Sequence, residues 1–408
     1  MPRHLCSHLA LVVALCRVLP AAAQTIPPQG LTLDAATSRA LAANPTLAAA
    51  RLRGAIASAA LGVASERLNP EASVEFAKET PRQAFGVAVP LELGGKRSKR
   101  IAVGHAAIRA AEAELVAITA QVRNDVRRAY YDVLVAGARL SVLEDLRDLS
   151  RRARDTARAR FDAGDAPRLE VLQADLALAA AENEVVATQG TSGAARARLN
   201  ALLGQRLDAI DPLSTPIDAG GPVVVAAVLD VARTRSAALA VLDRQIEEQY
   251  ARLALAQALR VPDVSPTATL THDAEPEFTY GWRAGVAVTV PLFTSHKAGV
   301  AVEQATLEQL KAERQALVSR IDGDVTAAAA LAEAQRLAFV RYRDQILPQA
   351  AEVEQLAQDS YQLGQTGIAA LLQALQASRD VRLRSLETLS QFQAALADLE
   401  RAIGAPLP

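Results

Sequence analysis

Two stretches of the sequence, FDAGDAPRLEVLQA (residues 161–174) and YQLGQTGIAALLQA (residues 361–374), share an aromatic residue, a glycine three positions later and a closing apolar pair with Gln-Ala. A second match lies upstream, where VAVPLELGGK (87–96) aligns with VTVPLFTSHK (288–297). Units of this length are too long for a solenoid, so the chain is predicted to be a tandem duplication of one large block. We expect two copies of the same shape, residues 24–204 and 223–408, joined by a Pro- and Gly-rich linker or equatorial segment at 205–222.

The composition indicates a helical protein and argues against several functions. Half of the residues are apolar, only 3% are aromatic, and the formal net charge is −1. Nucleic-acid binding needs a basic excess that this chain lacks, and soluble enzymes with deep pockets usually contain more aromatic residues. No phosphate-binding G-x-x-x-x-G-K-[ST] loop is present, so we expect no catalytic residue and no cofactor. The spacing of His105, His272 and His296 fits no zinc site, and no metal site is expected.

The first 23 residues have the features of a secretory signal peptide. A polar start precedes a short apolar run at 9–15 and three alanines at 21–23. Cys6 and Cys16 both lie in this segment, so the exported chain would contain no disulfide and no thiolate metal site. Leu15 is a poor match for lipid attachment at Cys16, and a lipoprotein is not expected. No later run of about 18 apolar residues exists, so we expect no transmembrane helix.

Each copy contains one candidate pair of membrane-crossing strands, at about 72–79 and 84–92 and at about 264–273 and 280–292. In the last of these, apolar side chains alternate with glycine, threonine and Arg283, and Tyr280 and Trp282 would form a membrane-interface girdle. A soluble hairpin would show the same alternation, but export, duplication and the adjoining helices favour the membrane. Four strands are too few to close a barrel, and an open edge in lipid leaves backbone groups unpaired. We therefore expect the chain to oligomerise.

The remaining segments are predicted to be long helices. Residues 98–161 contain no proline, whereas the matching segment 297–361 contains Pro348, where we expect a kink or break. The chain then turns at about 161–168 and 361–368 and returns as a coiled-coil-like hairpin. The apolar residues expected in the two hairpin seams are Leu169, Leu172, Leu176, Ala179 and Val186 in the first copy, and Leu389, Phe392, Leu396, Leu399 and Ile403 in the second.

Two further elements flank the strands. Matching helical stretches at 31–68 and 223–260 are predicted to end at Asn-Pro and Val-Pro, directly before the strands. The basic segment GGKRSKR (94–100) ends a strand and opens a helix, and we expect its four charges to be solvated anchors near a membrane boundary.

With these features the chain resembles the TolC-like outer-membrane efflux proteins over essentially its whole mature length. The opening LTLDAATSRALAANPTLAAAR (31–51), the two aromatic-x-x-Gly turns and the tandem order of helix, strand pair and long hairpin carry the resemblance. The stretch LELGGKRSKR (91–100) is similar to the cobalt-zinc-cadmium branch, the outer component of heavy-metal resistance pumps. The resemblance implies a mainly α fold with a small β part, in which a homotrimer forms a 12-stranded transmembrane β-barrel and a helical tunnel.

The same resemblance implies partners and sites. A periplasmic adaptor protein and an inner-membrane pump of the RND type would dock at the tips, around Gly164, Asp165, Gly364 and Gly367, where the three glycines supply the backbone freedom for opening. Acidic residues past the turns line the pore constriction in this family, and Glu170 matches such a position. A solvated helix residue beside Arg168 is an equal alternative for Glu170. The second copy has Ala370 and Gln373 there, so a second acidic ring is not expected.

The sequence shows no catalytic motif, which predicts a passive duct. The resemblance implies that this duct lies in the outer membrane with a long periplasmic extension, carries divalent heavy-metal ions and takes its energy from the partner pump. Drug efflux and type I protein secretion use the same fold and remain alternatives. A trimeric structural or adhesive envelope protein would explain the helices and strands, but not the two matched turns at which the stalks fold back.

Overall fold

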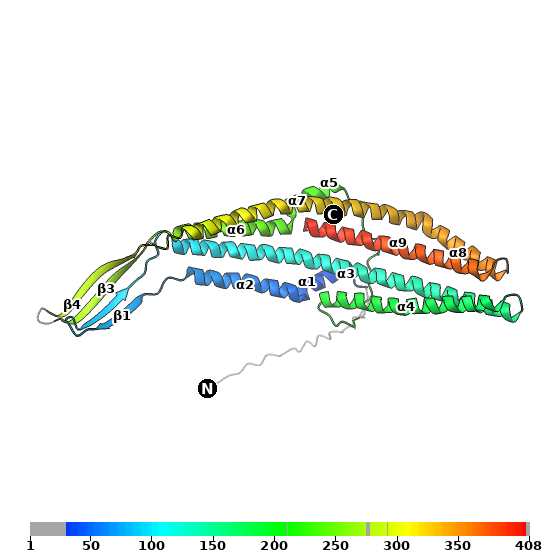
Figure 1. Cartoon of the computed structure of the whole chain (residues 1–408), viewed down its shortest axis with the longest axis horizontal. Coiled ribbons are helices and arrows are strands. Elements are labelled where there is room, and N and C mark those ends of the chain that lie inside the picture. Colours follow the sequence, from blue (N-terminus) through cyan, green and yellow to red (C-terminus); the bar gives the residue numbers. More distant parts are fainter. Residues whose placement is uncertain (1–29, 210, 275–277, 292, 405–408) are drawn as a thin grey trace, which may run out of the picture.

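The computed structural model describes residues 30–209, 211–274, 278–291 and 293–404. The predicted signal peptide, residues 1–23, lies outside these residues. The molecule is elongated, with a small sheet at one end and two helical turns at the other (Figure 1). The helices run along the long axis between these two ends, so the sheet and the turns are as far apart as the molecule allows.

The same order of elements occurs twice along the described chain. The first series is α1 (Leu33–Ala43), α2 (Pro45–Ser65), β1 (Glu71–Phe76), β2 (Gln83–Ala88), α3 (Lys96–Asp162) and α4 (Arg168–Leu202). The second series is α5 (Val225–Arg235), α6 (Ala237–Ala258), β3 (Asp263–Ala274), β4 (Phe278–Thr289), α7 (Lys297–Arg341), the π-helix η1 (Tyr342–Ile346), α8 (Leu347–Gln362) and α9 (Ile368–Ile403).

The helical stretches predicted at 31–68 and 223–260, before the strands, are each divided into two helices in the structure. Asn44 ends α1 with an extended backbone, and its Oδ1 accepts a hydrogen bond from the Thr46 N–H at 2.9 Å. Pro45 follows as the first residue of α2, where the missing N–H costs no helical bond. In the second series Ser236 caps α6 in the same way through the Leu239 N–H. A side-chain acceptor at each break therefore starts the second helix.

The two long helical paths differ at the position of the proline. α3 is continuous over 67 residues, about 100 Å at 1.5 Å per residue. The matching path contains the π-turn η1 directly before α8, whose second residue is Pro348. The Leu347 N–H bonds to the Tyr342 carbonyl, five residues back. The predicted break is thus a π-turn, which accommodates a proline that can donate no bond and would clash with the preceding turn.

The four strands form one antiparallel sheet in the order β1-β2-β3-β4, so β1 and β4 are its two edges. The predicted strands at 72–79 and 84–92 are shorter in the structure, whereas β3 and β4 have 12 residues each. The register places side chains of one kind on each face. One face exposes apolar residues, namely Val74, Phe76, Phe85, Val87, Leu270, Tyr280, Trp282, Val286 and Val288.

The side chains on the other face of the sheet are small or polar. Ser73, Gly86, Thr269 and Arg283 lie across one row of the four strands, since they occupy paired positions in the register. The predicted alternation in β4 is therefore continued by the other three strands, and the sheet is amphipathic as a whole.

The seam between α3 and α4 uses different residues from those predicted. Val171, Ala174, Leu178 and Val185 of α4 are buried. The predicted seam residues Leu169, Leu172, Leu176 and Val186 are instead 54–73% exposed, and Ala179 is exposed as well. In α9 the predicted residues Leu389, Phe392, Leu396, Leu399 and Ile403 are all buried. The 3,4 pattern on α4 is therefore a second apolar stripe without a partner in the described part of this protomer.

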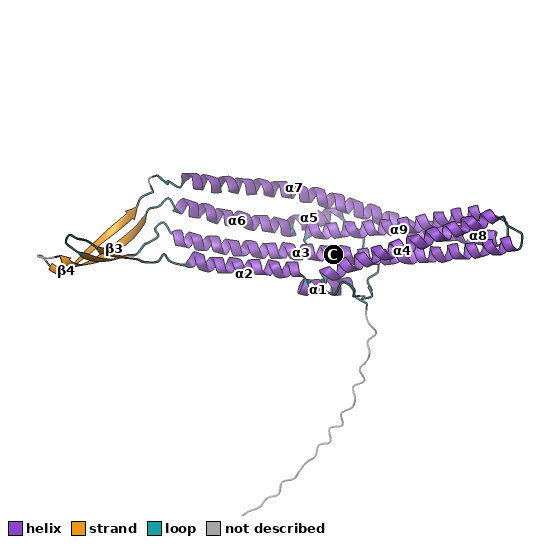
Figure 2. Ribbon diagram, turned by 60° about the horizontal axis from the view of Figure 1, so that its bottom comes forward, coloured by secondary structure: helices purple, strands orange, loops and turns teal. Residues whose placement is uncertain are grey.

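The segment between the two series packs against the middle of the long helices. Gln393 of α9 donates hydrogen bonds to the carbonyls of Ile217 and Ala219, at 3.0 and 2.7 Å. The Thr215 N–H donates to the Tyr130 hydroxyl of α3 at 3.1 Å. Residues 205–222, apart from 210, thus form an equatorial layer bonded to both long hairpins, halfway along the rod (Figure 2).

One described helix, α2, is long and apolar enough to cross a membrane by length and composition alone, although Arg51 and Arg53 interrupt its apolar sequence. α2 runs alongside α3 in the helical part (Figure 2). The two backbones approach closely at Gly104 of α3, where an added Cβ would lie 2.8 Å from Leu61 Cδ1. The structure therefore places α2 against another helix of the same chain.

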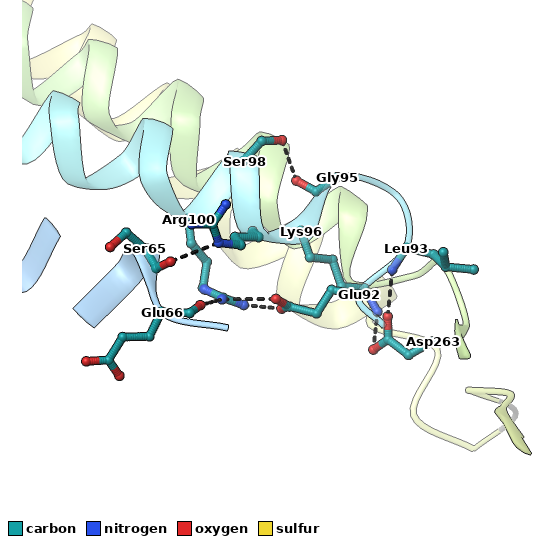
Figure 3. Close-up of polar contacts among 10 residues, drawn as sticks. Ser65, Glu66, Glu92, Leu93, Gly95, Lys96, Ser98, Arg100 and Asp263 are labelled. Carbon is teal, nitrogen blue, oxygen red and sulfur yellow. Dashed lines mark hydrogen bonds and ion pairs between the residues drawn. The ribbon is translucent and has the colours of Figure 1, made fainter. Parts of the chain in front are cut away.

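The basic segment 94–100 lies where the sheet joins the helices, and three of its four charges are bound rather than solvated, which corrects that prediction (Figure 3). Lys96 is 5% exposed, and its Nζ lies 2.7 Å from Asp263 Oδ2. Arg100 forms a two-point contact with Glu92, and the Arg97 guanidinium donates to the Ser65 carbonyl. Of the four, Lys99 is exposed. The segment therefore connects the end of α2, the start of α3 and the start of β3, where the chain passes between the helices and the sheet.

Candidate functional site at the helical tips

The two turns at the far end of the helices have the same backbone structure. Gly164 and Gly364 have φ angles of 83° and 71°. The next N–H groups, of Asp165 and Gln365, bond to carbonyls five residues back, each at 2.8 Å. This is the Schellman motif, which ends a helix with a left-handed residue and so favours glycine. The predicted tip residues Gly164, Asp165 and Gly364 are all exposed at these turns.

Gly367 differs from the other two glycines. It is the N-cap of α9 with φ −83° and ψ 163°, extended backbone that any residue adopts. The prediction that Gly367 supplies backbone freedom is therefore wrong on conformational grounds. A Cβ added to Gly367 would lie 3.7 Å from Glu170 Oε1, so the absence of a side chain leaves this turn open toward Glu170.

A polar cluster, which we call the tip junction, joins the two hairpins beside these turns and consists of Arg160, Glu170 and Tyr361. The Tyr361 hydroxyl donates to Glu170 Oε2 at 3.1 Å. Arg160 donates from Nη1 to the Tyr361 carbonyl at 3.2 Å, and its guanidinium carbon lies 4.8 Å from the centre of the Tyr361 ring. One aromatic side chain of α8 is thus held by residues of α3 and α4.

The tip junction keeps its tyrosine protonated. Tyr361 is 1% exposed, and burial together with the Glu170 carboxylate raises its pKa to about 12. The Arg160 cation acts in the opposite direction but is outweighed. The phenol therefore remains a hydrogen-bond donor at neutral pH, because its deprotonation would place two negative charges side by side.

The duplicated positions cannot form the same cluster. Phe161 matches Tyr361 but has no hydroxyl and is 38% exposed, and Glu170 is matched by Ala370. Arg160 is matched by Ser360. The tip junction therefore has no equivalent at the duplicated positions, although the two turns have the same backbone structure.

Two charged contacts continue from the tips toward the middle of the rod. Arg379 of α9 lies 2.5 Å from Glu184 of α4 and so connects the two hairpins. Within the second hairpin Glu354 is buried, accepts from the Ser378 hydroxyl at 2.5 Å and pairs with Arg382 at 2.8 Å. Polar contacts are directional, so they fix the relative position of helices whose seams consist largely of alanine and leucine.

The predicted girdle residues lie on the exposed apolar face of the sheet. Tyr280 and Trp282 are 66% and 81% exposed, near the free end of β4. The His272 ring lies 4.6 Å from the Tyr280 ring, and its buried Nδ1 has no hydrogen-bond partner among the described residues. Large exposed aromatic side chains beside valines are unfavourable in water and fit the boundary of a lipid layer.

The three histidines considered as metal ligands belong to three different parts of the structure. His105 is on α3, His272 is on β3 and His296 precedes α7. Within the described residues, no group of three or more His, Cys, Asp or Glu side chains is arranged to hold a metal ion.

Sequence reasoning identifies Glu170 and the tip glycines but misses Arg160 and Tyr361. In the sequence, Tyr361 is simply the aromatic residue of a repeated motif. A comparison of the two copies could have revealed the cluster. Tyr361, Arg160 and Glu170 each occupy a position where the other copy has a residue of different chemistry.

Comparison with known proteins agrees with this architecture. The sequence profile of the outer membrane efflux protein family matches residues 36–205. The cobalt-zinc-cadmium resistance protein CzcC of Cupriavidus metallidurans is 24% identical over 383 residues, which are 92% of this chain and 90% of CzcC. The nickel-cobalt-cadmium resistance protein NccC of Alcaligenes xylosoxydans xylosoxydans is 26% identical over 253 residues, 58% of this chain and 54% of NccC.

The fold is also that of solved channels. The open state of the Neisseria gonorrhoeae MtrE outer membrane channel superposes with a TM-score of 0.74 and 19% identity, covering 91% of this chain and 89% of MtrE. The predicted fold class and the predicted resemblance are thereby confirmed. The chain is therefore similar to outer-membrane efflux channels: it has their fold over most of its length, and it matches the outer membrane efflux protein profile over residues 36–205.

Proposed function

We propose that three copies of this chain form an outer-membrane channel that passively carries substrate out of the cell as the last component of a tripartite efflux pump. The observation that carries this proposal is the amphipathic four-stranded sheet with two open edges, attached to helices about 100 Å long. A sheet of this kind is stable in lipid only when its edges are paired. Three copies would contribute twelve strands, four from each.

The two faces of the sheet suit the two sides of such a barrel. The apolar face, with Trp282 and Val286 exposed at 81% and 66%, would contact lipid. The opposite face, with Arg283 and Thr269, would line a water-filled lumen. This distribution matches that of transmembrane β-barrels, in which an apolar band faces the lipid and the interior is polar.

The helical part would form the duct below the membrane, with the tips as its gate. The tip junction holds α8 against α3 and α4, so opening requires the second hairpin to move away from the first. The exposed turns at Gly164, Asp165, Gly364 and Gly367 would dock a periplasmic adaptor and an inner-membrane pump of the RND type, which supplies the energy. Glu170 would border the constriction while holding the gate closed.

The substrates we infer are divalent heavy-metal ions. Two relatives that match this chain are named for resistance to cobalt, zinc, cadmium and nickel. A wide aqueous duct can pass such ions without binding them tightly, and weak binding favours release.

Two measurements test this proposal. The purified mature chain in mild detergent should have the mass of a trimer and should form pores in planar lipid membranes. A strain without the gene should lose tolerance to cobalt, zinc and cadmium, and the intact gene should restore it. A monodisperse monomer without pore activity would refute the channel, whereas unchanged metal tolerance with increased drug sensitivity would refute the metal substrate alone.

A further inference from the structure

The ion pair between Lys96 and Asp263 links the two copies at the helical end of the sheet (Figure 3). Lys96 is the first residue of α3, and Asp263 is the first residue of β3. Asp263 also accepts the Leu93 N–H at 3.1 Å, directly before α3 begins. The pair therefore joins the end of the β2–α3 connection to the start of the neighbouring strand.

Both members of this pair have counterparts in the duplicated sequence. Lys297 is the first residue of α7, and Glu71 is the first residue of β1. In the sequence, GGK ending at Lys96 aligns with SHK ending at Lys297, and Pro-Asp at Asp263 aligns with Pro-Glu at Glu71. The basic residue opens the long helix in each copy, and the acidic residue opens the strand.

The backbone enters the two long helices in the same way. Gly95 before Lys96 has φ 69° and ψ 26°, and His296 before Lys297 has φ 53° and ψ 10°. His296 is the one non-glycine residue with a positive φ in the described chain. Since this conformation is unfavourable for histidine, its presence shows that the second junction is built to the same plan as the first.

Lys297 and Glu71 nevertheless do not meet within one protomer. Lys297 follows the edge strand β4 and Glu71 begins the opposite edge strand β1, so the whole sheet lies between them. Both side chains are exposed, and neither makes an ion pair or hydrogen bond within the described part of the chain. Each would need a partner from another molecule to repeat the contact of Lys96 with Asp263.

We propose that Lys297 of one protomer pairs with Glu71 of the next, and that β4 and β1 join with Val290 opposite Val74 and Val288 opposite Phe76. This inference rests on the proposed trimer and specifies its seam. The register follows from the β2–β3 pair, in which the Val89 N–H donates to the Pro266 carbonyl and Val87 lies opposite Ala268. Lys297 lies 201 positions after Lys96, and Glu71 lies 192 positions before Asp263. The same shifts convert Val89 and Pro266 into Val290 and Val74.

The free edge of β1 supports this register independently. The Ala77 N–H bonds to the Arg82 carbonyl across the β1–β2 pair, so odd-numbered residues of this strand face β2. Neighbouring residues of a strand direct their backbone groups to opposite sides, so the N–H and C=O of Val74 and Phe76 face the open edge. These are the residues that the proposed seam uses.

Paired cysteines test the register. The exported chain would contain no other cysteine, since Cys6 and Cys16 precede residue 24. Directly opposed residues of an antiparallel pair have Cα atoms about 5.5 Å apart, within the range of a disulfide. Val74→Cys with Val290→Cys should therefore give covalently linked dimers and trimers on oxidation. Val74→Cys with Val286→Cys, four residues out of register, should not.

Charge exchange tests the ion pair. Lys297→Glu should lower the temperature at which the detergent-solubilised trimer dissociates, and adding Glu71→Lys to the same chain should restore most of the difference. Lys99→Glu is the matched control, because Lys99 is an exposed lysine of the same region without a counterpart acid in this scheme. The control should leave the trimer unchanged.

The outcomes separate the seam from the trimer itself. If the unmodified protein is trimeric but only the offset cysteine pair cross-links, or if neither pair does, the proposed register is wrong. If Lys297→Glu behaves like Lys99→Glu, or if Glu71→Lys does not rescue it, the ion pair is wrong. A monomeric unmodified protein would instead refute the proposed channel on which the seam depends.

Discussion

Replacing Tyr361 with phenylalanine should open the channel. The change removes one hydroxyl and keeps the ring, which is 1% exposed and lies under the Arg160 guanidinium. The phenylalanine cannot form the hydrogen bond that the Tyr361 hydroxyl donates to Glu170 Oε2, 3.1 Å in length. Since α8 carries the tyrosine and α4 carries the carboxylate, the closed arrangement of the two hairpins loses stability while each hairpin keeps its own core.

The size of the effect follows from the charge of the acceptor. A hydrogen bond to a charged group contributes about 1.5–3 kcal/mol net, and the partial exposure of Glu170 places this one near the lower limit. If the three protomers open together, the closed state loses about 4 kcal/mol, which is roughly a thousandfold in the opening equilibrium. If they open singly, the change is about tenfold for each protomer.

Single-channel recording in planar lipid membranes measures this equilibrium as the open probability. Tyr342→Phe is the matched control, because it removes the same hydroxyl from η1, outside the tip junction. An open probability for Tyr361→Phe no higher than for Tyr342→Phe would refute the role of the tip junction in closure.

The pH dependence has a definite sign. Burial and the Glu170 charge raise the Tyr361 pKa from 10.0 to about 12, so the protonated phenol is the form that the closed state stabilises. Its contribution is fully present below pH 10 and is lost as the pH rises toward 12. Closure should therefore gain no pH dependence from Tyr361 between about pH 6 and 9, and Tyr361→Phe should lack the alkaline change.

Three further substitutions test other parts of the structure. Gly364→Leu places a side chain at φ 71° and should cost about 1–2 kcal/mol locally, so that adaptor binding weakens in a binding assay while the trimer remains assembled. Lys96→Met leaves Asp263 without its cation and should lower the free energy of unfolding by about 1–3 kcal/mol in a denaturant titration, since Asp263 is 34% exposed. Gly104→Val forces α2 away from α3 and should lower the thermal midpoint, equivalent to about 1–3 kcal/mol of overpacking.

Matched variants separate these effects from general damage. Gly193→Leu introduces the same side chain in α4, away from the tips and where no atom lies within 4 Å of the added Cβ, and should leave adaptor binding intact. Gly137→Val adds a side chain where no atom lies within 4 Å, so its thermal midpoint should stay near that of the unmodified protein. Adding Asp263→Asn to Lys96→Met should recover part of the stability, and no recovery would contradict the ion-pair explanation.

Periodicity predicts the element types but not which face of a helix is buried. The 3,4 stripe of Leu169, Leu172 and Leu176 on α4 satisfies the coiled-coil pattern, yet the seam with α3 uses Val171 and Ala174. A helix with two apolar stripes has two possible seams, and periodicity cannot rank them. The prediction of solvated charges at 96–100 fails for a related reason, because a solvated lysine and a lysine paired with a distant aspartate have the same local sequence.

The duplication can be recognised from the sequence, because the two copies share motifs. The two glycine turns and the break near Pro348 can be predicted as well, because each depends on residues close in the chain. Backbone conformation, hydrogen-bond capping and side-chain period are local properties. The contact of Tyr361 with Glu170, 191 positions away, and that of Lys96 with Asp263, where α3 and β3 begin, follow only from the tertiary structure. Those contacts depend on how the two copies lie against each other, and the relative placement of two similar units is not encoded within either unit.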